Sequence, residues 1–225
     1  MRRAVLILII ILSVTSSAFG AVLANAGFKV GMSNSGLSFT GNEARPFLGY
    51  EIEWMTWQRL MGIQAGVFKE FGISQNFGIQ AEIYYARRGM DASTHYLFDD
   101  VDYKVRLDYI EVPVALKTEL PLSESIAAGL VFGPYLATNI GAERSSRIDG
   151  ISEEIGLKNV KNFDYGFITG LCLDIATRKP NWVLEIRYNH GLCNVMEPIE
   201  NSARVSGEDG TVKNRSFVVL IGAHL

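Results

Sequence analysis

The most constraining feature of the sequence is an apolar residue at every second position, repeated in one segment after another. Residues 61–68 carry Met, Ile, Ala and Val at odd positions and Gly, Gln, Gly and Phe at even ones. Residues 77–88 repeat the pattern, with Gln80, Glu82 and Arg88 on the even side. Successive side chains of a β-strand point to opposite faces, so each segment predicts a strand with one apolar and one polar or small face.

Eight segments of the chain carry this alternation. An even number of strands that run alternately up and down brings the last strand back to the side where the first begins. After the N-terminal segment, charged or polar residues interrupt every apolar run, and a membrane helix needs about 20 apolar residues. The predicted strands cover residues 27–37, 61–68, 77–88, 103–120, 126–141, 162–175, 182–193 and 214–225.

The connections between these strands fall into two length classes that alternate along the chain. Three are tight turns, at residues 72–76, 121–125 and 177–181. Short turns on one side and long loops on the other are typical of outer-membrane β-barrels. The predicted fold is an all-β, eight-stranded antiparallel up-and-down transmembrane β-barrel. The long, polar or irregular connections are residues 38–60, 91–102, 142–161 and 194–213.

The composition of the polar face indicates which face lines the barrel. It mixes charged residues with glycines such as Gly66 and Gly133, which suits the crowded interior of a narrow barrel. The alternative is a soluble, lipocalin-like binding barrel, whose apolar face would point inward around a ligand. The predicted lumen charge network consists of Glu82, Arg88, Arg106, Asp108, Glu111, Lys117, Asp164, Asp174, Glu185 and Arg187.

One predicted strand changes the parity of its charges. Arg106 and Asp108 occupy even positions, whereas Glu111 and Lys117 occupy odd ones. A β-bulge inserts one extra residue into a strand and so changes the facing of the residues beyond it. We therefore expect a bulge near residues 109–110 that keeps all four charges in the lumen.

The register of the last tight turn bears on the two cysteines. If that turn pairs position 175 with 182, Cys172 lies opposite Glu185 and Cys193 lies opposite Asp164. The two sulfurs are then on the order of 26 Å apart along the ladder, beyond disulfide reach. We predict two free thiols.

The N-terminus carries the three parts of a secretory signal: two arginines, an apolar run over residues 4–14, and small residues up to position 20. We expect cleavage after residue 20, with a second candidate site after residue 26, leaving a single barrel domain over residues 21–225. The formal net charge of −3 becomes −5 when the two arginines are lost. This mild acidity does not favour a nucleic-acid partner.

Several short segments together resemble the small outer-membrane β-barrel proteins (porin-like, PorT-type) of Bacteroidetes, over essentially the whole mature chain. The resemblance implies an outer-membrane barrel, and the lack of a catalytic histidine motif predicts no enzymatic activity. Two features depart from the family pattern: the chain ends in Leu225 and not in an aromatic residue, and the first long connection contains Trp54 and Trp57. The similar segments are residues 27–32, 62–68, 107–113, 133–135, 164–166, 185–192 and the closing strand.

We expect a structural or surface-interaction role, in which a barrel with a side-chain-filled lumen presents four extracellular loops and keeps both mature termini in the periplasm. A narrow porin-like channel or small-ligand transporter is the alternative. Expected partners are outer-membrane lipid, the barrel-assembly machinery, and an unidentified extracellular or periplasmic protein. The sequence predicts no nucleic-acid partner and no cofactor.

The histidines do not form a catalytic motif. His95, His190 and His224 are the three histidines of the chain, and none lies in a His-x-Ser arrangement. The acidic run at residues 99–102 is interpreted as a solvated loop and not as a cation site. No catalytic, cofactor-binding or metal-binding residue is predicted.

Overall fold

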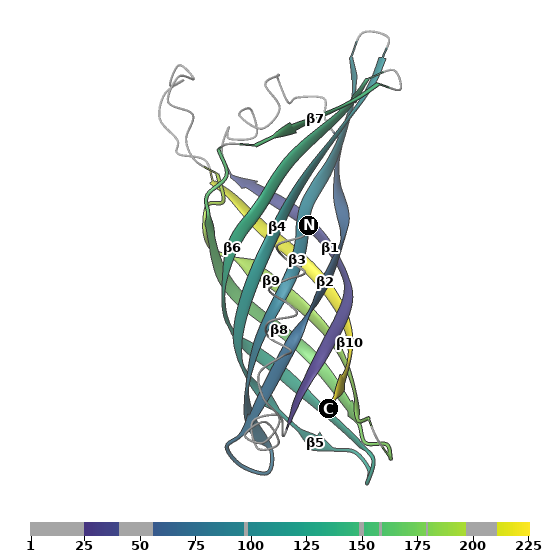
Figure 1. Cartoon of the computed structure of the whole chain (residues 1–225), viewed down its shortest axis with the longest axis vertical. Coiled ribbons are helices and arrows are strands. Elements are labelled where there is room, and N and C mark those ends of the chain that lie inside the picture. Colours follow the sequence, from purple (N-terminus) through teal and green to yellow (C-terminus); the bar gives the residue numbers. More distant parts are fainter. Residues whose placement is uncertain are drawn as a thin grey trace, which may run out of the picture.

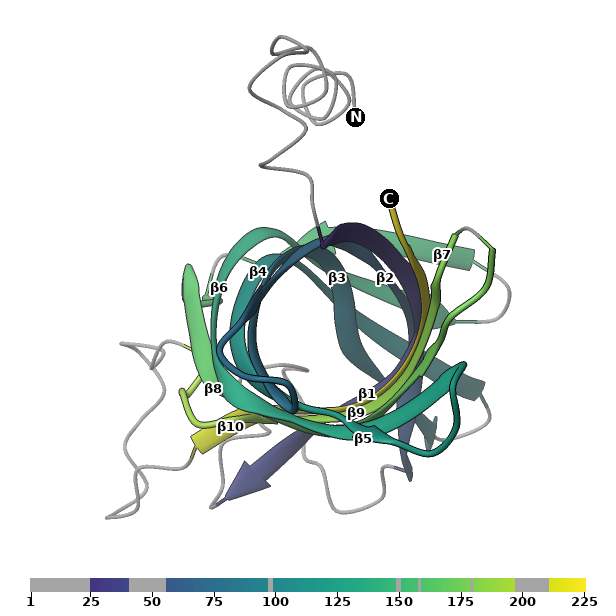
Figure 2. The same cartoon turned by 90° about the horizontal axis from the view of Figure 1, so that it is seen from below.

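The computed structural model describes residues 25–40, 56–96, 99–148, 151–157, 159–178, 180–196 and 211–225. In these parts of the chain no helix has the length and apolarity needed to cross a membrane. Eight long antiparallel strands form a closed ring (Figure 1 and Figure 2). They are β1 (Ala26–Thr40), β2 (Thr56–Gly72), β3 (Phe77–Tyr96), β4 (Asp99–Thr118), β6 (Ile126–Ile148), β8 (Phe163–Ile175), β9 (Trp182–Gly191) and β10 (Thr211–His224).

Each strand of the ring pairs with its neighbours in the chain, and β1 pairs with β10 to close the barrel. Residues 73–76, 122–125 and 176–181 connect strands at one end, which also holds the C-terminus and which we call the turn end (Figure 1). The opposite end is called the loop end. Two short strands complete the fold, β5 (Leu120–Pro121) at the turn end and β7 (Ile151–Gly156) at the loop end. The predicted all-β, eight-stranded up-and-down barrel is confirmed.

Two of the predicted long connections are largely strand. Strand β3 continues to Tyr96 and β4 begins at Asp99, while β6 continues to Ile148 and β7 pairs back onto it. Residues 89–96, 99–107, 141–148 and 151–156 together rise above the rest of the barrel at the loop end (Figure 1), and we call them the extension. Both connections are long, as predicted, but the predicted strand bounds at residues 88, 103 and 141 were wrong, because the strand alternation continues into both connections. The described residues do not include the signal segment, the tip of the 91–102 connection at residues 97–98, or Trp54.

The outer surface of the barrel below the extension is an apolar belt. Leu130 keeps 56% of its surface exposed and Ile83 keeps 51%. A water-soluble barrel would leave these side chains in water, whereas in a membrane they contact lipid chains. The lipocalin-like alternative is therefore wrong for this fold. Other exposed members of the belt are Phe28, Val30, Met32, Met61, Ile63, Val67, Val112, Val114, Leu116, Phe132, Phe167, Leu171, Leu184, Ile186, Val219 and Ile221.

Aromatic rings lie outward near both ends of the belt. Phe77 and Trp182 are exposed at the first residues of strands that start at the turn end. Phe163 and Phe217 are exposed nearer the loop end. Such rings are typical of the interfacial girdles of membrane barrels.

The register between β8 and β9 confirms the prediction for the cysteines. Cys172 pairs with Glu185, and Ile175 pairs with Trp182 across the turn. Cys172 is buried, Cys193 is half-buried, and both thiols are free.

Candidate functional site

The inward face of the barrel below the extension is polar and buried. Three layers of charged and hydrogen-bonding side chains follow one another from the turn end toward the loop end. Each layer draws residues from several strands, because only one side chain in two along each strand points inward.

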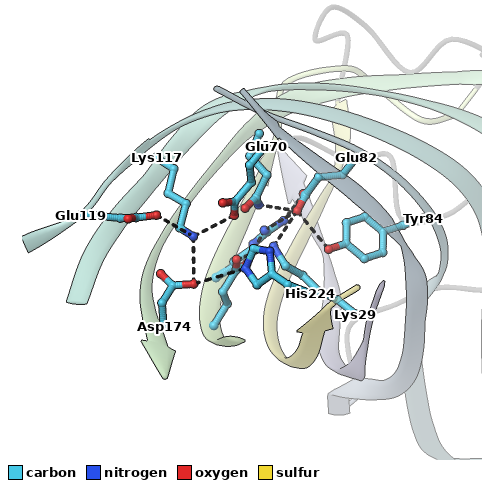
Figure 3. Close-up of polar contacts among 11 residues, drawn as sticks. Lys29, Glu70, Glu82, Tyr84, Lys117, Glu119, Asp174 and His224 are labelled. Atoms are coloured by element: carbon cyan, nitrogen blue, oxygen red, sulfur yellow. Dashed lines mark hydrogen bonds and ion pairs between the residues drawn. The ribbon is translucent and has the colours of Figure 1, made fainter. Parts of the chain in front are cut away.

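The floor layer, at the turn end, centres on the ammonium group of Lys117. Its Nζ lies 2.8 Å from Glu70 Oε1, 2.9 Å from Asp174 Oδ1 and 3.1 Å from Glu119 Oε1. His224 Nε2 lies 3.9 Å from the same Asp174 oxygen. Figure 3 shows these side chains converging from β2, β4, β8, β10 and, for Glu119, the link after β4. The floor layer therefore consists of Glu70, Lys117, Glu119, Asp174 and His224.

The central layer centres on the carboxylate of Glu82. Lys29 Nζ donates to Glu82 Oε1 over 2.9 Å, and Arg187 donates to both carboxylate oxygens, at 2.5 and 2.8 Å. Tyr84 donates to Glu82 Oε1 over 3.1 Å (Figure 3). Glu185 is also paired with Lys29 and Arg187. Two acids and two bases thus neutralise each other where water is excluded.

The upper layer centres on the guanidinium group of Arg88. It pairs with Glu111 and lies 3.4 Å from Asp164 Oδ2. Tyr135 donates to the same Asp164 oxygen over 3.3 Å, and Asn214 donates to it over 2.8 Å. The ring of Tyr135 also faces the guanidinium, 5.0 Å from its centroid. The cation–π contact and the hydrogen bonds together stabilise the buried Arg88 charge.

Glycine makes room for the tyrosines inside the barrel. Gly66 pairs with Tyr84 and Gly166 pairs with Tyr135 across neighbouring strands. A Cβ added at Gly66 would lie 2.6 Å from the Tyr84 ring, and one at Gly166 would lie 2.8 Å from the Tyr135 ring. The inward glycines therefore allow an aromatic ring to lie over the neighbouring strand.

Above the upper layer the interior becomes apolar. Val105, Leu107 and Tyr109 of β4 are fully buried there. Val195 and Met196 pack against them from the link after β9, together with Val212 of β10. We call this cluster the apolar plug. It is the loop-end part of a larger buried cluster that continues down the barrel, and it consists of Met90, Ala92, Tyr103, Val105, Leu107, Tyr109, Val160, Val195, Met196 and Val212.

Most of the predicted lumen charges meet in these layers. The structure brings together Glu82, Arg88, Glu111, Lys117, Asp164, Asp174, Glu185 and Arg187.

The predicted lumen position of the other two charges, Arg106 and Asp108, was wrong. Arg106 and Asp108 point outward, where Asp108 pairs with Arg87 at 2.8 Å and Arg106 lies 3.9 Å from Glu154. A bulge does occur beside Tyr109, but β4 runs through it with unbroken alternation. Asp108 pairs with residue 141 of β6 and Tyr109 with residue 139, so the extra residue belongs to β6. Arg106 and Asp108 point outward because water surrounds that part of the barrel. Glu111 and Lys117 point inward because lipid surrounds the barrel there.

Sequence reasoning missed several members of the layers. Lys29 is the most important, because it bridges Glu82 and Glu185. A signal was present: Lys29 shares its strand face with Gly27 and Gly31, opposite an apolar face. Glu70 was missed because β2 extends beyond residue 68, where the predicted strand ended. Tyr84, Tyr135, Asn189 and Asn214 are also inward partners in the layers.

The histidines are far apart. His190 lies near the loop end of β9, paired with Phe167, whereas His224 lies in the floor layer. The side chains of His95, Asp99 and Asp100 lie outside the described residues. Asp102 lines a pocket of about 330 Å³ in the extension, together with Lys104 and other, mostly polar, residues.

A model of the outer membrane protein beta-barrel domain matches residues 22–197 of the chain. A comparison with curated proteins found no match. Among solved structures, the chain is similar to Ail, the attachment invasion locus protein of Yersinia pestis, at 16% identity and a TM-score of 0.39, over 88% of this chain and 96% of that one.

It is also similar to OprG of Pseudomonas aeruginosa, at 10% identity and a TM-score of 0.44, over 88% of this chain and 94% of that one. It is likewise similar to Neisserial surface protein A (NspA), at 10% identity and a TM-score of 0.40, over 90% of this chain and 98% of that one. Family membership follows from the match to the domain model, which covers more than half of the chain. The protein is an outer-membrane β-barrel, and its chain belongs to the outer membrane protein beta-barrel domain family.

Proposed function

We propose that this protein is a non-conducting, non-enzymatic barrel that presents its loop end for contact with another molecule. The observation that carries the proposal is the filled interior. Arg88 and Arg187, two of the largest side chains in the chain, are no more than 2% exposed within the barrel. Eight strands leave an interior just wide enough for side chains, and the ion-paired layers and the apolar plug occupy it.

We further propose that the turn end faces the periplasm and the loop end faces the outside of the cell. Short periplasmic turns and longer outer loops are the usual arrangement in such barrels. Both termini of the mature chain would then be periplasmic, and an N-terminal signal would be removed after residue 20 or 26. N-terminal sequencing of protein purified from the outer membrane identifies the cleavage site.

The partners that this role requires follow from the three surfaces. Outer-membrane lipid would contact the apolar belt, and the barrel-assembly machinery would insert the chain. The extension offers a polar outer surface to a protein or other molecule outside the cell. Charged, hydroxyl and amide side chains from five strands line its pocket: Gln58, Asp91, Ser93, Asp102, Lys104, Arg106, Ser145, Arg147 and Ser152. Nothing in this role calls for a nucleic acid.

Conductance across a planar bilayer tests the central claim. The refolded protein should leave the bilayer silent, because buried salt bridges and the apolar plug leave no wide aqueous path. A double variant, Tyr109→Ala with Tyr135→Ala, removes two buried rings and should produce small, unsteady currents. That variant shows that the recording can detect an opened lumen. Steady stepwise currents from the unmodified protein would contradict the proposal and favour the narrow channel.

Labelling of intact cells tests the orientation separately. In a Cys193→Ser background, a cysteine at Ser152 lies in the extension and one at Ser123 lies in a tight turn. An impermeant maleimide should label the Ser152→Cys variant in intact cells and the Ser123→Cys variant only after the outer membrane is opened. The reverse pattern would place the turn end outside.

A further inference from the structure

The floor layer differs from the other layers in its donor chemistry. Glu70, Asp174 and His224 each offer a ligand atom, and these atoms all lie within 4.8 Å of one another. They come from β2, β8 and β10, so the closed barrel itself brings them together. Figure 3 shows the three side chains directed toward a common point beside the Lys117 ammonium.

The floor layer is also the least neutralised. In the central layer, Lys29 and Arg187 balance Glu82 and Glu185. In the floor layer, the three ionised carboxylates of Glu70, Glu119 and Asp174 face the single ammonium of Lys117. With His224 neutral, three negative charges and one positive charge leave −2. Among the described residues, moreover, the buried Oδ2 atom of Asp174 has no hydrogen-bond partner.

We propose that the floor layer is a binding site for a divalent transition-metal ion of the zinc type, with Glu70, Asp174 and His224 as ligands. An imidazole nitrogen with two carboxylates suits Zn²⁺ and similar ions, whereas Ca²⁺ and Mg²⁺ prefer a shell made only of oxygens. Zinc takes these ligands at about 2.0–2.2 Å, so small side-chain rotations bring all three donors onto one ion. The sequence by itself predicted no metal site, because these residues are scattered through the chain.

The structure also provides a route for the ion and a place for the displaced lysine. A pocket of about 240 Å³, lined by Glu70, Lys117, Glu119 and the 72–79 turn region, adjoins the layer at the turn end. Glu119 is not one of the three metal ligands, and it lies 3.1 Å from the Lys117 ammonium. Lys117 can therefore remain paired with Glu119 while the ion takes its position between Glu70 and Asp174. Metal and ammonium compete for the same two carboxylates.

Zinc titration of the refolded, tag-free barrel against a chromophoric chelator tests the site. The unmodified protein should bind one equivalent of Zn²⁺. His224→Gln should weaken binding more than about tenfold, since loss of even an outer-shell partner weakens metal sites roughly 10–100-fold. His190→Gln is the matched control at the other end of the barrel and should leave the affinity unchanged. Heat modifiability of each variant on a gel shows that the barrel is folded.

Lys117→Met distinguishes this site from a purely structural ion-pair cluster. Removing the competing ammonium should tighten zinc binding by about tenfold or more, since it frees two carboxylates for the ion. Absence of zinc binding in the unmodified protein, or equal affinity in the His224→Gln and His190→Gln variants, would overturn the proposal. If Lys117→Met does not fold, the two histidine variants still decide the question. A silent lumen in bilayer recordings is expected whichever result is obtained, so the two proposals fail independently.

Discussion

The two parts of the barrel, the belt region and the extension, use opposite arrangements of the same strands. In the belt region the outward face is apolar and the inward face carries charges, whereas in the extension the outward face is polar and the inward face is the apolar plug. Arg87 and Arg88 mark the change in β3. Arg88 is buried among carboxylates, and its neighbour Arg87 is 38% exposed and pairs outward with Asp108.

The difference shows that strand alternation specifies two faces but does not by itself specify which face is buried in protein. In lipid, the apolar face is stable outward and the polar groups must satisfy each other inside. Above the lipid, water solvates the outward polar face, and apolar side chains gain by meeting inside. Each prediction changes one face in one region, and the first three use the other face or the other region as the control.

The largest effect is expected from the two neighbouring arginines. Arg88→Met removes the base that neutralises Glu111 and Asp164, and leaving buried charges without a partner costs about 3–5 kcal/mol. Arg87→Met breaks a partly exposed pair and should cost no more than about 1 kcal/mol. Reversible denaturant unfolding in phospholipid vesicles measures both. Equal losses would mean that the two faces are not distinct.

The next effect concerns the outward face. Ile83→Lys introduces a charge into the apolar belt, where a lysine at the membrane midplane costs about 2–4 kcal/mol. Ser145→Lys makes a comparable change on the outward face of the extension. The free energy of unfolding of this variant should lie within about 0.5 kcal/mol of that of the unmodified protein. The same vesicle unfolding assay compares them. A large loss for the Ser145 variant would place the extension in lipid.

A third change tests the apolar plug. Leu107→Ala removes a fully buried side chain from the extension, and core Leu→Ala changes start at about 2 kcal/mol. Because the plug lies at the loop end, the loss should appear first as faster amide hydrogen exchange in β3 and β4 of the extension. Leu130→Ala, on the lipid-facing surface, is the control and should leave the exchange of the extension unchanged. Uniform acceleration in both variants would argue against a separate plug.

The smallest effect is a pH dependence in the extension. Partial burial of Asp91 raises its pKa above the ordinary value, although Lys104, 3.8 Å away, opposes the rise. A raised carboxyl pKa in the folded state means that this group favours folding most when protonated, and that this contribution is lost as pH rises through the folded pKa. Asp91→Asn should therefore stabilise the protein slightly at neutral pH, by less than about 0.5 kcal/mol. At a pH below the ordinary aspartate pKa, the substitution should bring no such gain. Unfolding midpoints at acidic and neutral pH test the sign, and a destabilised variant at neutral pH would contradict it.

Much of the barrel could be predicted because its signals are local. The strands, the tight turns and the position of Cys172 opposite Glu185 follow from the period of two and from turn composition. The parity of Arg106 and Asp108 could not be interpreted from β4 alone. Whether a charged face points into the lumen or into water depends on the height of the residue relative to the membrane, and that height is a property of the assembled barrel.

The sequence by itself determined that the chain forms eight amphipathic strands with alternating short and long connections, because side-chain alternation and turn residues act over only a few positions. Only the tertiary structure decided which charges meet. Lys29, Glu82, Glu185 and Arg187 lie on three strands that are distant in sequence. The members of the floor layer come from four strands and the link after β4. Closure of the barrel, with its register between β1 and β10, brings them together. The physical reason is that a buried charge is stable only beside its partner, and that partner is supplied by the ring of strands and not by the neighbouring sequence.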